Sequence, residues 1–423
     1  MKISELIWVF PALSTLAYGA PSSPGRFQEL PTTSGSKHLR PVLERRQSRS
    51  GFADGEPFDG KGKGAPFSGG TNRELDLQNP DNLGQQSTDS GVVVNLKWSF
   101  SDSKTRLLNG GWTREQVVTD LPASKDIAAA RGSIRELHWH RAEWGFVYAG
   151  QVAVSAVDEN GRNQYEILNE GDIWYFPKGE AHTVQGLAEQ NEYLLAFDDG
   201  DFDASGTTFM VDDWITHTPK DILARNFGVD ASVFKNVPSP NPYITNATVS
   251  TEGIDSPNGK LEGNSSYVYH ASQFAPTEVP GGGGTIHTVD SRNFPVAKTI
   301  AASIVTLKPG ALRELHWHPN AEEWLYFVSG KARATVFIGG ATARTFDFSA
   351  GDTAVFPDNA GHYVENTSNQ TLTWIELYKS DRVVDISLTQ WLALTPVPIV
   401  AQVLHVDEEV VRNLKKEKQV IIA

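Results

Sequence analysis

One long segment of this chain occurs twice, and this internal repeat limits the fold more than any other feature. The sequence GSIRELHWH at residues 132–140 recurs as GALRELHWH at 310–318. Further along each copy, EGDIWYFPKGEAH ends at His182 and AGDTAVFPDNAGH ends at His362. Matched landmarks in the same order indicate that each copy is a structural unit of one kind. We therefore expect two similar domains in tandem.

Short alternating runs between these landmarks indicate the fold class. QVAVSAV at 151–157 and KARATVFI at 331–338 alternate apolar with small or polar residues, and glycine or proline turns follow closely. This pattern is typical of antiparallel strands in a jelly roll or β-barrel. Each copy then has a Thr-Pro pair, Thr218-Pro219 and Thr395-Pro396. Threonine as N-cap and proline in the first turn predict a short closing helical segment in each all-β domain.

The histidines of the second copy have the spacing of a metal site. His316 and His318 flank Trp317 on a predicted strand, where residues two apart point to the same face. Glu323 and His362 follow. Three imidazoles and one carboxylate suit Mn, Fe, Zn or Ni. A single strand histidine is more often a core or surface polar group, but six of the chain's 11 histidines occur in this pattern, three in each copy.

The first copy supplies His138, His140, Glu143 and His182, with one difference. Only two residues separate His140 from Glu143, whereas four separate the corresponding pair in the second copy. Both glutamates precede a tryptophan, so they are equivalent. We expect the shorter turn to hold Glu143 farther from its histidines, which makes the second site the better formed of the two.

These motifs resemble the cupin pattern of spaced Gly, His, Glu, Pro and Asn residues. The second copy matches it with Gly310, His316, His318, Glu323, Gly330, Gly351, Pro357, His362 and Asn366, and departs at Asn359, where glycine is usual. The first matches with Gly132, His138, His140, Glu143, Gly150, Gly171, Pro177, Gly179 and His182, and has Gly186 where asparagine is usual. From about residue 90 to 410 the chain resembles the bicupin oxalate decarboxylase family, in its fungal, secreted form.

This resemblance implies an all-β chain of two cupin domains. The expected divisions are a signal peptide (1–19), a propeptide or extended arm (20–90), cupin domain 1 (91–235), a linker (236–284), cupin domain 2 (285–410) and a C-terminal tail (411–423).

The resemblance also implies the chemistry: conversion of oxalate to formate and carbon dioxide, with two Mn ions, one per domain, and dioxygen as cofactors. Arg135 and Arg313 precede the first histidine of each site by three residues and are expected to bind oxalate at the mouth. A salt bridge to the adjacent Glu136 or Glu314 is the alternative. Glu376 is expected to enter the second cavity as the acid–base residue, or else to pair with Arg313 for structure alone.

A proton donor decides between two reactions, because without one the oxidation runs on to carbon dioxide and hydrogen peroxide. The family's first-domain lid usually carries Ser-Glu, whereas here the glutamate position is Ala204, preceded by Asp203. A bicupin oxalate oxidase is therefore the first rival to the decarboxylase. A non-enzymatic storage or binding bicupin is the second, although such proteins commonly lack the histidine set.

The N-terminus and four sequons predict a secreted glycoprotein. An apolar stretch at 6–16 and Ala17-Tyr18-Gly19 form a signal-peptide pattern, and Arg45-Arg46 is a candidate processing site. The sequons begin at Asn246, Asn264, Asn366 and Asn369. No cysteine is present, which excludes disulfides and thiolate ligands. A net charge of -14 disfavours nucleic acid as a partner, no long mid-chain apolar run predicts a membrane span, and a homo-oligomer remains open.

Overall fold

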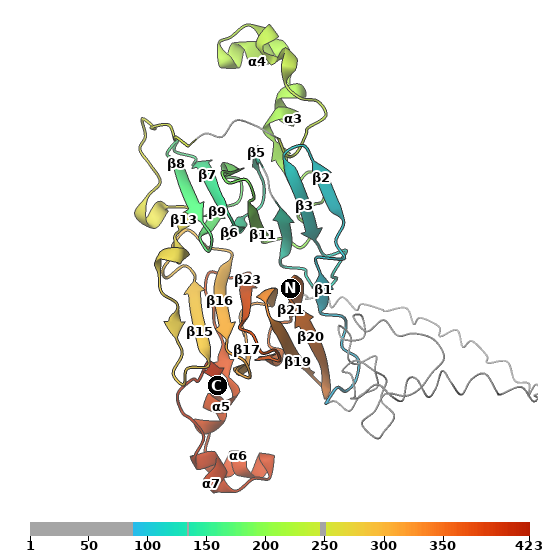
Figure 1. Cartoon of the computed structure of the whole chain (residues 1–423), viewed down its shortest axis with the longest axis vertical. Coiled ribbons are helices and arrows are strands. Elements are labelled where there is room, and N and C mark those ends of the chain that lie inside the picture. Colours follow the sequence, from blue (N-terminus) through green and yellow to red (C-terminus); the bar gives the residue numbers. More distant parts are fainter. Residues whose placement is uncertain (1–87, 133–134, 246–250) are drawn as a thin grey trace, which may run out of the picture. The chain divides into compact units, whose positions relative to one another are not determined.

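The computed structural model describes residues 88–132, 135–245 and 251–423 (Figure 1). The side chains of residues 133–137 also lie outside the description. The predicted signal peptide, almost all of the predicted arm, and the sequon at Asn246 are thus not described. No helix among the described residues is long and apolar enough to cross a membrane.

The first repeat forms a seven-stranded and a five-stranded antiparallel sheet. The larger has the order β13-β9-β6-β11-β4-β3-β2 and the smaller the order β12-β5-β10-β7-β8. The strands are β2 (Thr105–Leu108), β3 (Gly111–Gln116), β4 (Ala128–Gly132), β5 (Arg135–Trp139), β6 (Glu143–Ala149), β7 (Gln151–Val157), β8 (Asn163–Asn169), β9 (Ile173–Phe176), β10 (Ala181–Gly186), β11 (Glu192–Phe197), β12 (Phe209–Met210) and β13 (Val268–Tyr269).

The second repeat forms the matching pair of sheets. The seven-stranded one has the order β1-β21-β18-β23-β16-β15-β14, and the other has the order β20-β19-β22-β17-β24, with β25 also pairing with β17. The strands are β1 (Lys97–Ser99), β14 (Thr277–Glu278), β15 (Gly284–Val289), β16 (Ala301–Leu307), β17 (Leu312–Trp317), β18 (Glu323–Ser329), β19 (Lys331–Gly339), β20 (Thr342–Ser349), β21 (Asp352–Phe356), β22 (Gly361–Asn366), β23 (Leu372–Tyr378), β24 (Ile386–Ser387) and β25 (Ile421–Ile422).

The predicted all-β fold of two jelly-roll cupins is confirmed, although the sheets do not close into barrels. In the first half, Val152 and Val184 of the small sheet share one core with Val147 and Leu195 of the large sheet. This is the double-sheet solution, in which the alternating apolar face of each sheet is buried against the other.

Each half borrows an edge strand from sequence outside its own repeat. β1 pairs with β21, with Trp98 opposite Thr353, although it precedes the first repeat. β13 pairs with β9, with Val268 opposite Trp174, although it lies in the segment predicted as a linker. These strands cover edges that would otherwise expose unpaired backbone groups. The segment 236–284 is therefore partly structural, and Leu261 within it is buried in the first core.

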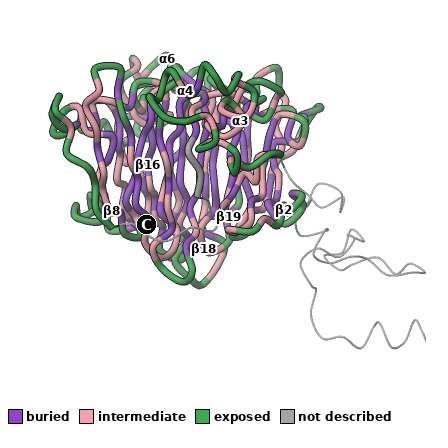
Figure 2. Tube along the Cα trace, turned by 90° about the horizontal axis from the view of Figure 1, so that it is seen from above, coloured by how far each residue is buried: buried purple, intermediate pink, exposed green. Residues whose placement is uncertain are grey.

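A third core lies between the two large sheets and fixes the direction of the glutamate side chains. It contains Trp144 and Trp324, and the Nε1–H of Trp324 donates to Oε1 of Gln116 at 2.8 Å. Successive side chains of a strand point to opposite faces. Glu143 and Glu323, each next to one of these tryptophans, therefore point into the interior of their own half. Figure 2 shows the buried residues running along the strands, with exposed residues in the loops and helices.

The predicted closing helices are present, but threonine does not cap them. The helices are α3 (Val211–Thr216), α4 (Lys220–Phe227), α5 (Leu388–Ala393), α6 (Val397–Leu404) and α7 (Glu408–Arg412), with 3₁₀ turns η2 (Ala231–Asn236), η3 (Gly263–Ser265) and η4 (Ala271–Gln273). The residues preceding α4 and α6 are Pro219 and Pro396. Thr218 instead donates back to the carbonyl of Trp214, at 2.7 Å, so it closes the preceding helix. Thr395 does the same with Trp391.

Candidate metal centres

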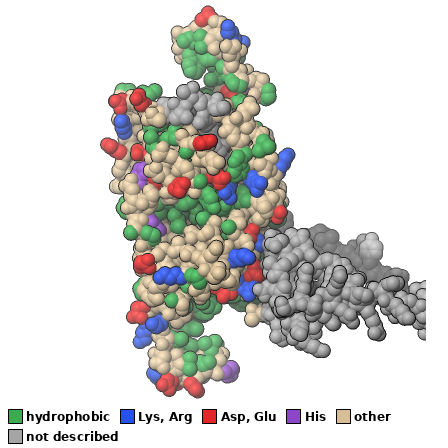
Figure 3. Space-filling model, viewed as in Figure 1, with side chains coloured by type: hydrophobic (Ala, Val, Ile, Leu, Met, Phe, Trp, Pro, Cys, Tyr) green, Lys and Arg blue, Asp and Glu red, His purple; other side chains and the backbone are tan. Residues whose placement is uncertain are grey.

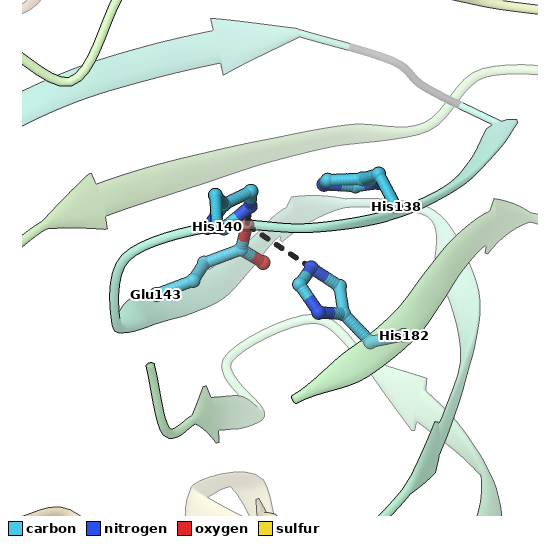
Figure 4. A group of neighbouring side chains, drawn as sticks. All are labelled: His138, His140, Glu143 and His182. Carbon is cyan, nitrogen blue, oxygen red and sulfur yellow. Dashed lines mark ion pairs between the residues drawn. The ribbon is translucent and has the colours of Figure 1, made fainter. Parts of the chain in front are cut away.

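The first centre is built from both sheets of the first half. His138 on β5 lies directly opposite His182 on β10 in the small sheet, and His140 follows β5 by one residue. Glu143 begins β6 of the large sheet. The four side chains are buried and their donor atoms lie within 4.8 Å of one another. Figure 4 shows them pointing toward one point between the strands.

The second centre repeats this arrangement. His316 on β17 pairs with His362 on β22, His318 follows β17, and Glu323 begins β18. These four donors also lie within 4.8 Å of one another and are buried. Glu323, as predicted, is the glutamate that joins this group. Its neighbour Glu322 points elsewhere and accepts the backbone N–H of Asp126 at 3.2 Å.

Backbone carbonyls orient the imidazoles for metal binding. The Nδ1 atom lies 2.6 Å from the carbonyl of Glu314 in His316, 2.8 Å from Val384 in His318 and 2.9 Å from Ala360 in His362. In the first centre His140 and His182 make the same contact, each at 2.7 Å. An Nδ1–H donating to a carbonyl leaves the Nε2 lone pair facing the centre, as in metal-ligating histidines generally.

The surroundings in both centres favour the protonation states in which histidine and glutamate bind a metal ion, neutral imidazole and charged carboxylate. Burial, with the neighbouring histidines, lowers the pKa of His138 well below its ordinary value. Burial, with Arg313 and the neighbouring histidines, does the same to the pKa of His316. Burial acts to raise the pKa of Glu323, but His362 and His318 outweigh it and lower the pKa. Among the described residues, His182 Nε2 and His316 Nε2 are buried without a hydrogen-bond partner. Neutral imidazoles, a charged carboxylate and unpartnered inward nitrogens fit a divalent ion.

The short turn does not remove Glu143 from the first centre. Its Oε2 lies 3.1 Å from His140 Nε2 and 3.8 Å from His182 Nε2. Glu323 Oε2 lies 3.3 Å from His318 Nε2 and 2.8 Å from His362 Nε2. The two missing residues are absorbed before β6, which still begins at the glutamate. Of these distances, the one to the third histidine is longer in the first centre and the one to the second histidine is shorter, and a more distant Glu143 stays a prediction for the metal-bound protein.

The chain is similar to known proteins over most of its length. The cupin family model matches residues 109–235 and 273–412. A probable oxalate decarboxylase of Arthroderma benhamiae is 60% identical over 381 residues, covering 88% of this chain and 94% of the relative. Oxalate decarboxylase OxdC of Bacillus subtilis is 43% identical over 370 residues, covering 85% of this chain and 95% of the relative. A solved structure of the Bacillus subtilis oxalate decarboxylase superposes with a TM-score of 0.82 at 42% identity, covering 88% of this chain and 99% of that one.

The chain belongs to the bicupin oxalate decarboxylase family. The centres of this bicupin differ in what surrounds the metal ligands. A cleft opens at the first centre and is lined, besides the ligands His138, His140 and Glu143, by Thr113, Glu115, Ala130, Leu195, Phe197, Phe202, Thr208 and Tyr243.

The second centre of this bicupin is surrounded by a buried polar network. Glu376 on β23 accepts from the Nε1–H of Trp374 at 3.0 Å and from the hydroxyl of Tyr378 at 2.8 Å. Burial raises the pKa of Glu376 to about 7; the charge of Glu323 adds to this effect and Arg313 opposes it. Glu376 thus lies beside the second centre, because the hydroxyl of its partner Tyr378 is also 3.4 Å from Nε2 of the ligand His318. Its tyrosine partner was not predicted, although Glu376 and Tyr378 are two residues apart on β23 and therefore share a face of the strand.

Of the two arginines predicted to bind the substrate, the structure describes the side chain of Arg313 alone. Arg313 is buried, and its Nη2 lies 2.6 Å from Asp385 Oδ2 while its Nη1 donates to the carbonyl of Val420 at 3.2 Å. The expected alternative partner Glu314 does not pair with it, and instead accepts from Ser387 and from the backbone N–H of Val420. Arg313 is thus held in place by the C-terminal tail. The side chain of Arg135 lies outside the described residues.

The loop expected to act as the lid of the first site places no carboxylate in the cleft. Ala204 lies in a turn in which its N–H donates to the carbonyl of Asp201 at 3.1 Å. Phe202 and Thr208 are the members of this loop that line the cleft, whereas Asp203 is exposed. The one carboxylate there besides the ligand Glu143 is Glu115, among the described lining residues. Sequence reasoning missed it because it lies on a strand before the first motif.

Proposed function

We propose that this chain is an oxalate decarboxylase, which converts oxalate to formate and carbon dioxide with manganese and dioxygen as cofactors. The observation that carries the proposal is the presence of two complete three-histidine, one-glutamate centres in a chain 60% identical to a probable oxalate decarboxylase. A related structure of the Bacillus subtilis enzyme is described for its Mn(II) centres. One-electron oxidation of oxalate, which weakens its C–C bond, is the chemistry that manganese with dioxygen supplies when bound. One ion would be held by His316, His318, Glu323 and His362, and the other by His138, His140, Glu143 and His182.

The residues of the chain supply charge and a proton. In the overall reaction the C–C bond of oxalate breaks, carbon dioxide leaves, and the remaining carbon gains a proton to become formate. In the second centre Arg313, whose charge is paired with Asp385, places a guanidinium near the ligand His316, where it would orient a dianionic substrate. Glu376, with a pKa raised to about 7, still carries its proton in mildly acidic solution and can deliver it.

The proposal is tested by one assay with two products. Purified, metal-loaded protein is incubated aerobically with oxalate while formate and peroxide are measured together. Formate in large excess over peroxide supports the decarboxylase. Peroxide with little formate assigns the chain to the oxalate oxidases. Neither product, together with absence of bound metal by elemental analysis, supports a non-enzymatic binding protein. The same elemental analysis identifies the metal.

We also propose that the protein is secreted and N-glycosylated at Asn264 and Asn369, which are exposed. The sequon at Asn366 is a different case, because its side-chain nitrogen donates to the carbonyls of Leu307 at 3.0 Å and Gln370 at 2.7 Å. A sugar on that nitrogen would replace one of these bonds, so we expect Asn366 to stay unmodified. Peptide mapping of protein from a culture medium, before and after removal of N-glycans, tests the set and the signal-peptide cleavage.

Exposed apolar side chains on the helical segments support a homo-oligomer. Trp214 on α3 and Phe227 on α4 are 64% and 54% exposed, and Val403 on α6 is 71% exposed. Figure 3 shows hydrophobic side chains gathered at the end that carries α4. Apolar surface of this kind commonly marks a contact with another chain. Light scattering after size-exclusion chromatography is expected to show more than one copy, and replacing Phe227 and Val403 by Ser should return the mass to that of a monomer.

A further inference from the structure

Glu115 is a cleft-lining carboxylate of the first centre that has no role as a metal ligand. It lies on β3, and Thr113, two residues earlier on the same strand, lines the same cleft. His138 and His140 line it too. The Glu115 side chain is 13% exposed. Burial of a charge is costly unless the charge is paired, and the pairing here is with an arginine at the rim, so the carboxyl can line the cleft without being a metal ligand.

The strand registers place Glu115 at the level of the first large sheet that corresponds to Glu376 in the second. In the second half, Glu376 on β23 pairs with Ser303 on β16, and Ser303 pairs with Thr288 on β15. In the first half, the three corresponding positions are Leu195 on β11, Ala130 on β4 and Glu115 on β3. Each half thus has one carboxylate at this level of the sheet. In the first half it is Glu115 on the outer of the three strands, and in the second half it is Glu376 on the inner one.

The surroundings of Glu115 keep a proton within reach of solvent. Arg106 on β2 places Nη2 3.1 Å from Glu115 Oε2 and is itself 48% exposed. Asp203 in the loop before β12 and Asp120 in the turn after β3 are the acidic groups that face it. Burial raises the pKa of Glu115, Arg106 opposes the effect, and the two aspartates add to it. Glu115 therefore lines the cleft of the first centre, and its carboxyl is paired with an arginine that is partly exposed to solvent.

We propose that Glu115 is the acid–base residue of the first centre. This inference rests on the proposed decarboxylase function. It assigns the proton donor of the first centre, where Ala204 replaces the usual glutamate of the lid and cannot transfer a proton. As the C–C bond of oxalate breaks and carbon dioxide leaves, the O–H bond of Glu115 breaks and its proton forms the C–H bond of formate. No net electrons are gained or lost in the turnover. The carboxylate left on Glu115 regains a proton from water on the side of Arg106.

Product formation provides the first test, with the second centre silenced. In a Glu376→Gln background, Glu115→Gln is expected to lower the rate of formate production about 100-fold, while metal content stays unchanged. Glu115→Asp should recover part of the rate with a shifted pH profile. The matched control is Glu189→Gln, an exposed site in the same half, which should leave rate and profile as they were. Full formate production by the Glu115→Gln protein, with its pH profile intact, overturns the proposal.

Infrared spectroscopy provides a second test that needs no turnover. Under nitrogen, adding oxalate to the metal-loaded Glu376→Gln protein should change the C=O stretch of a protonated carboxyl, and this change should vanish in the Glu115→Gln protein. An identical change in both proteins means that Glu115 does not exchange a proton at the site, and the inference fails. If the unaltered chain makes no formate at all, the decarboxylase function itself fails, and the infrared comparison still decides whether Glu115 responds to oxalate.

Discussion

The ion pair between Arg313 and Asp385 provides a test of how the second centre is held together. Arg313 is 2% exposed and Asp385 15%, with 2.6 Å between Nη2 and Oδ2. Lys418 from the C-terminal tail also donates to Asp385, at 2.7 Å. Removing one partner of a buried pair costs about 3–5 kcal/mol, because the other charge is left without compensation. Since Arg313 keeps the carbonyl of Val420, we expect Asp385→Asn to cost about 3 kcal/mol, near the lower end.

A loss of this size increases local opening by roughly a hundredfold. Hydrogen exchange of the β17 and β25 amides measures it directly, which avoids treating a chain of two halves as one two-state unit. The matched control is Asp347→Asn, which breaks the more exposed pair of Asp347 with Arg333, 44% exposed. Exposed pairs contribute about 1 kcal/mol or less, so little change is expected there.

The pH dependence of this effect has a definite sign. Burial acts to raise the pKa of Asp385, but Arg313 and Lys418 outweigh it and lower the pKa. A lowered pKa in the folded state gives stability that is complete above the unfolded value, about 3.9, and is lost as the pH falls through the folded value. The difference between the unaltered chain and Asp385→Asn should therefore be largest near neutral pH and shrink in acid. Equal exchange rates in the Asp385→Asn and Asp347→Asn proteins at pH 7 would refute this account of Arg313.

Three further changes test the centres themselves. With Glu115 already replaced by Gln, Glu376→Gln should lower the remaining formate production by roughly two or more orders of magnitude without loss of metal, as product assay and elemental analysis will show; unchanged formate would mean that Glu376 is structural. His362→Ala should remove metal from the second domain only, so retention of both ions would contradict the ligand set. Ala204→Glu should raise the formate-to-peroxide ratio by adding a donor to the lid, and an unchanged ratio would mean that the loop never reaches the substrate.

Much of the metal chemistry could be read from the sequence because it depends on local spacing. Residues two apart on a strand share a face, which brings His316 and His318 together once the strand is recognised. The alternation of Glu323 with Trp324 likewise decides which side chain enters the cavity. The repeat then predicted the same centre twice, and the structure brings together both sets of four residues.

The turn lengths show where local reasoning stopped. Two residues fewer before Glu143 predict a more distant carboxylate, and its Oε2 lies 3.8 Å from His182 Nε2 where the matching distance in the second centre is 2.8 Å. β6 nevertheless begins at Glu143, whose backbone pairs with Phe176 and Phe197 on either side. Pairing across the sheet, not the length of the loop, sets the position of the glutamate. Pairing across the sheet also explains why the predicted linker and tail contribute the strands β13 and β25. Both strands pair with backbone groups at a sheet edge that would otherwise be unpaired.

The sequence by itself determined the fold class, the two ligand sets and the family, which follow from periodicity and from two short motifs that recur in the same order in each repeat. Only the tertiary structure decided which charges meet. Arg313 pairs with Asp385 and contacts the C-terminal tail. Glu115 lines the cleft of the first centre, although its strand lies more than twenty residues before the nearest ligand. The first pairing joins neighbouring strands of one sheet, because β24 and β25 both pair with β17, whereas the second brings together the two stacked sheets of the first half. The order of strands in a sheet, not the order of residues in the chain, sets their distances.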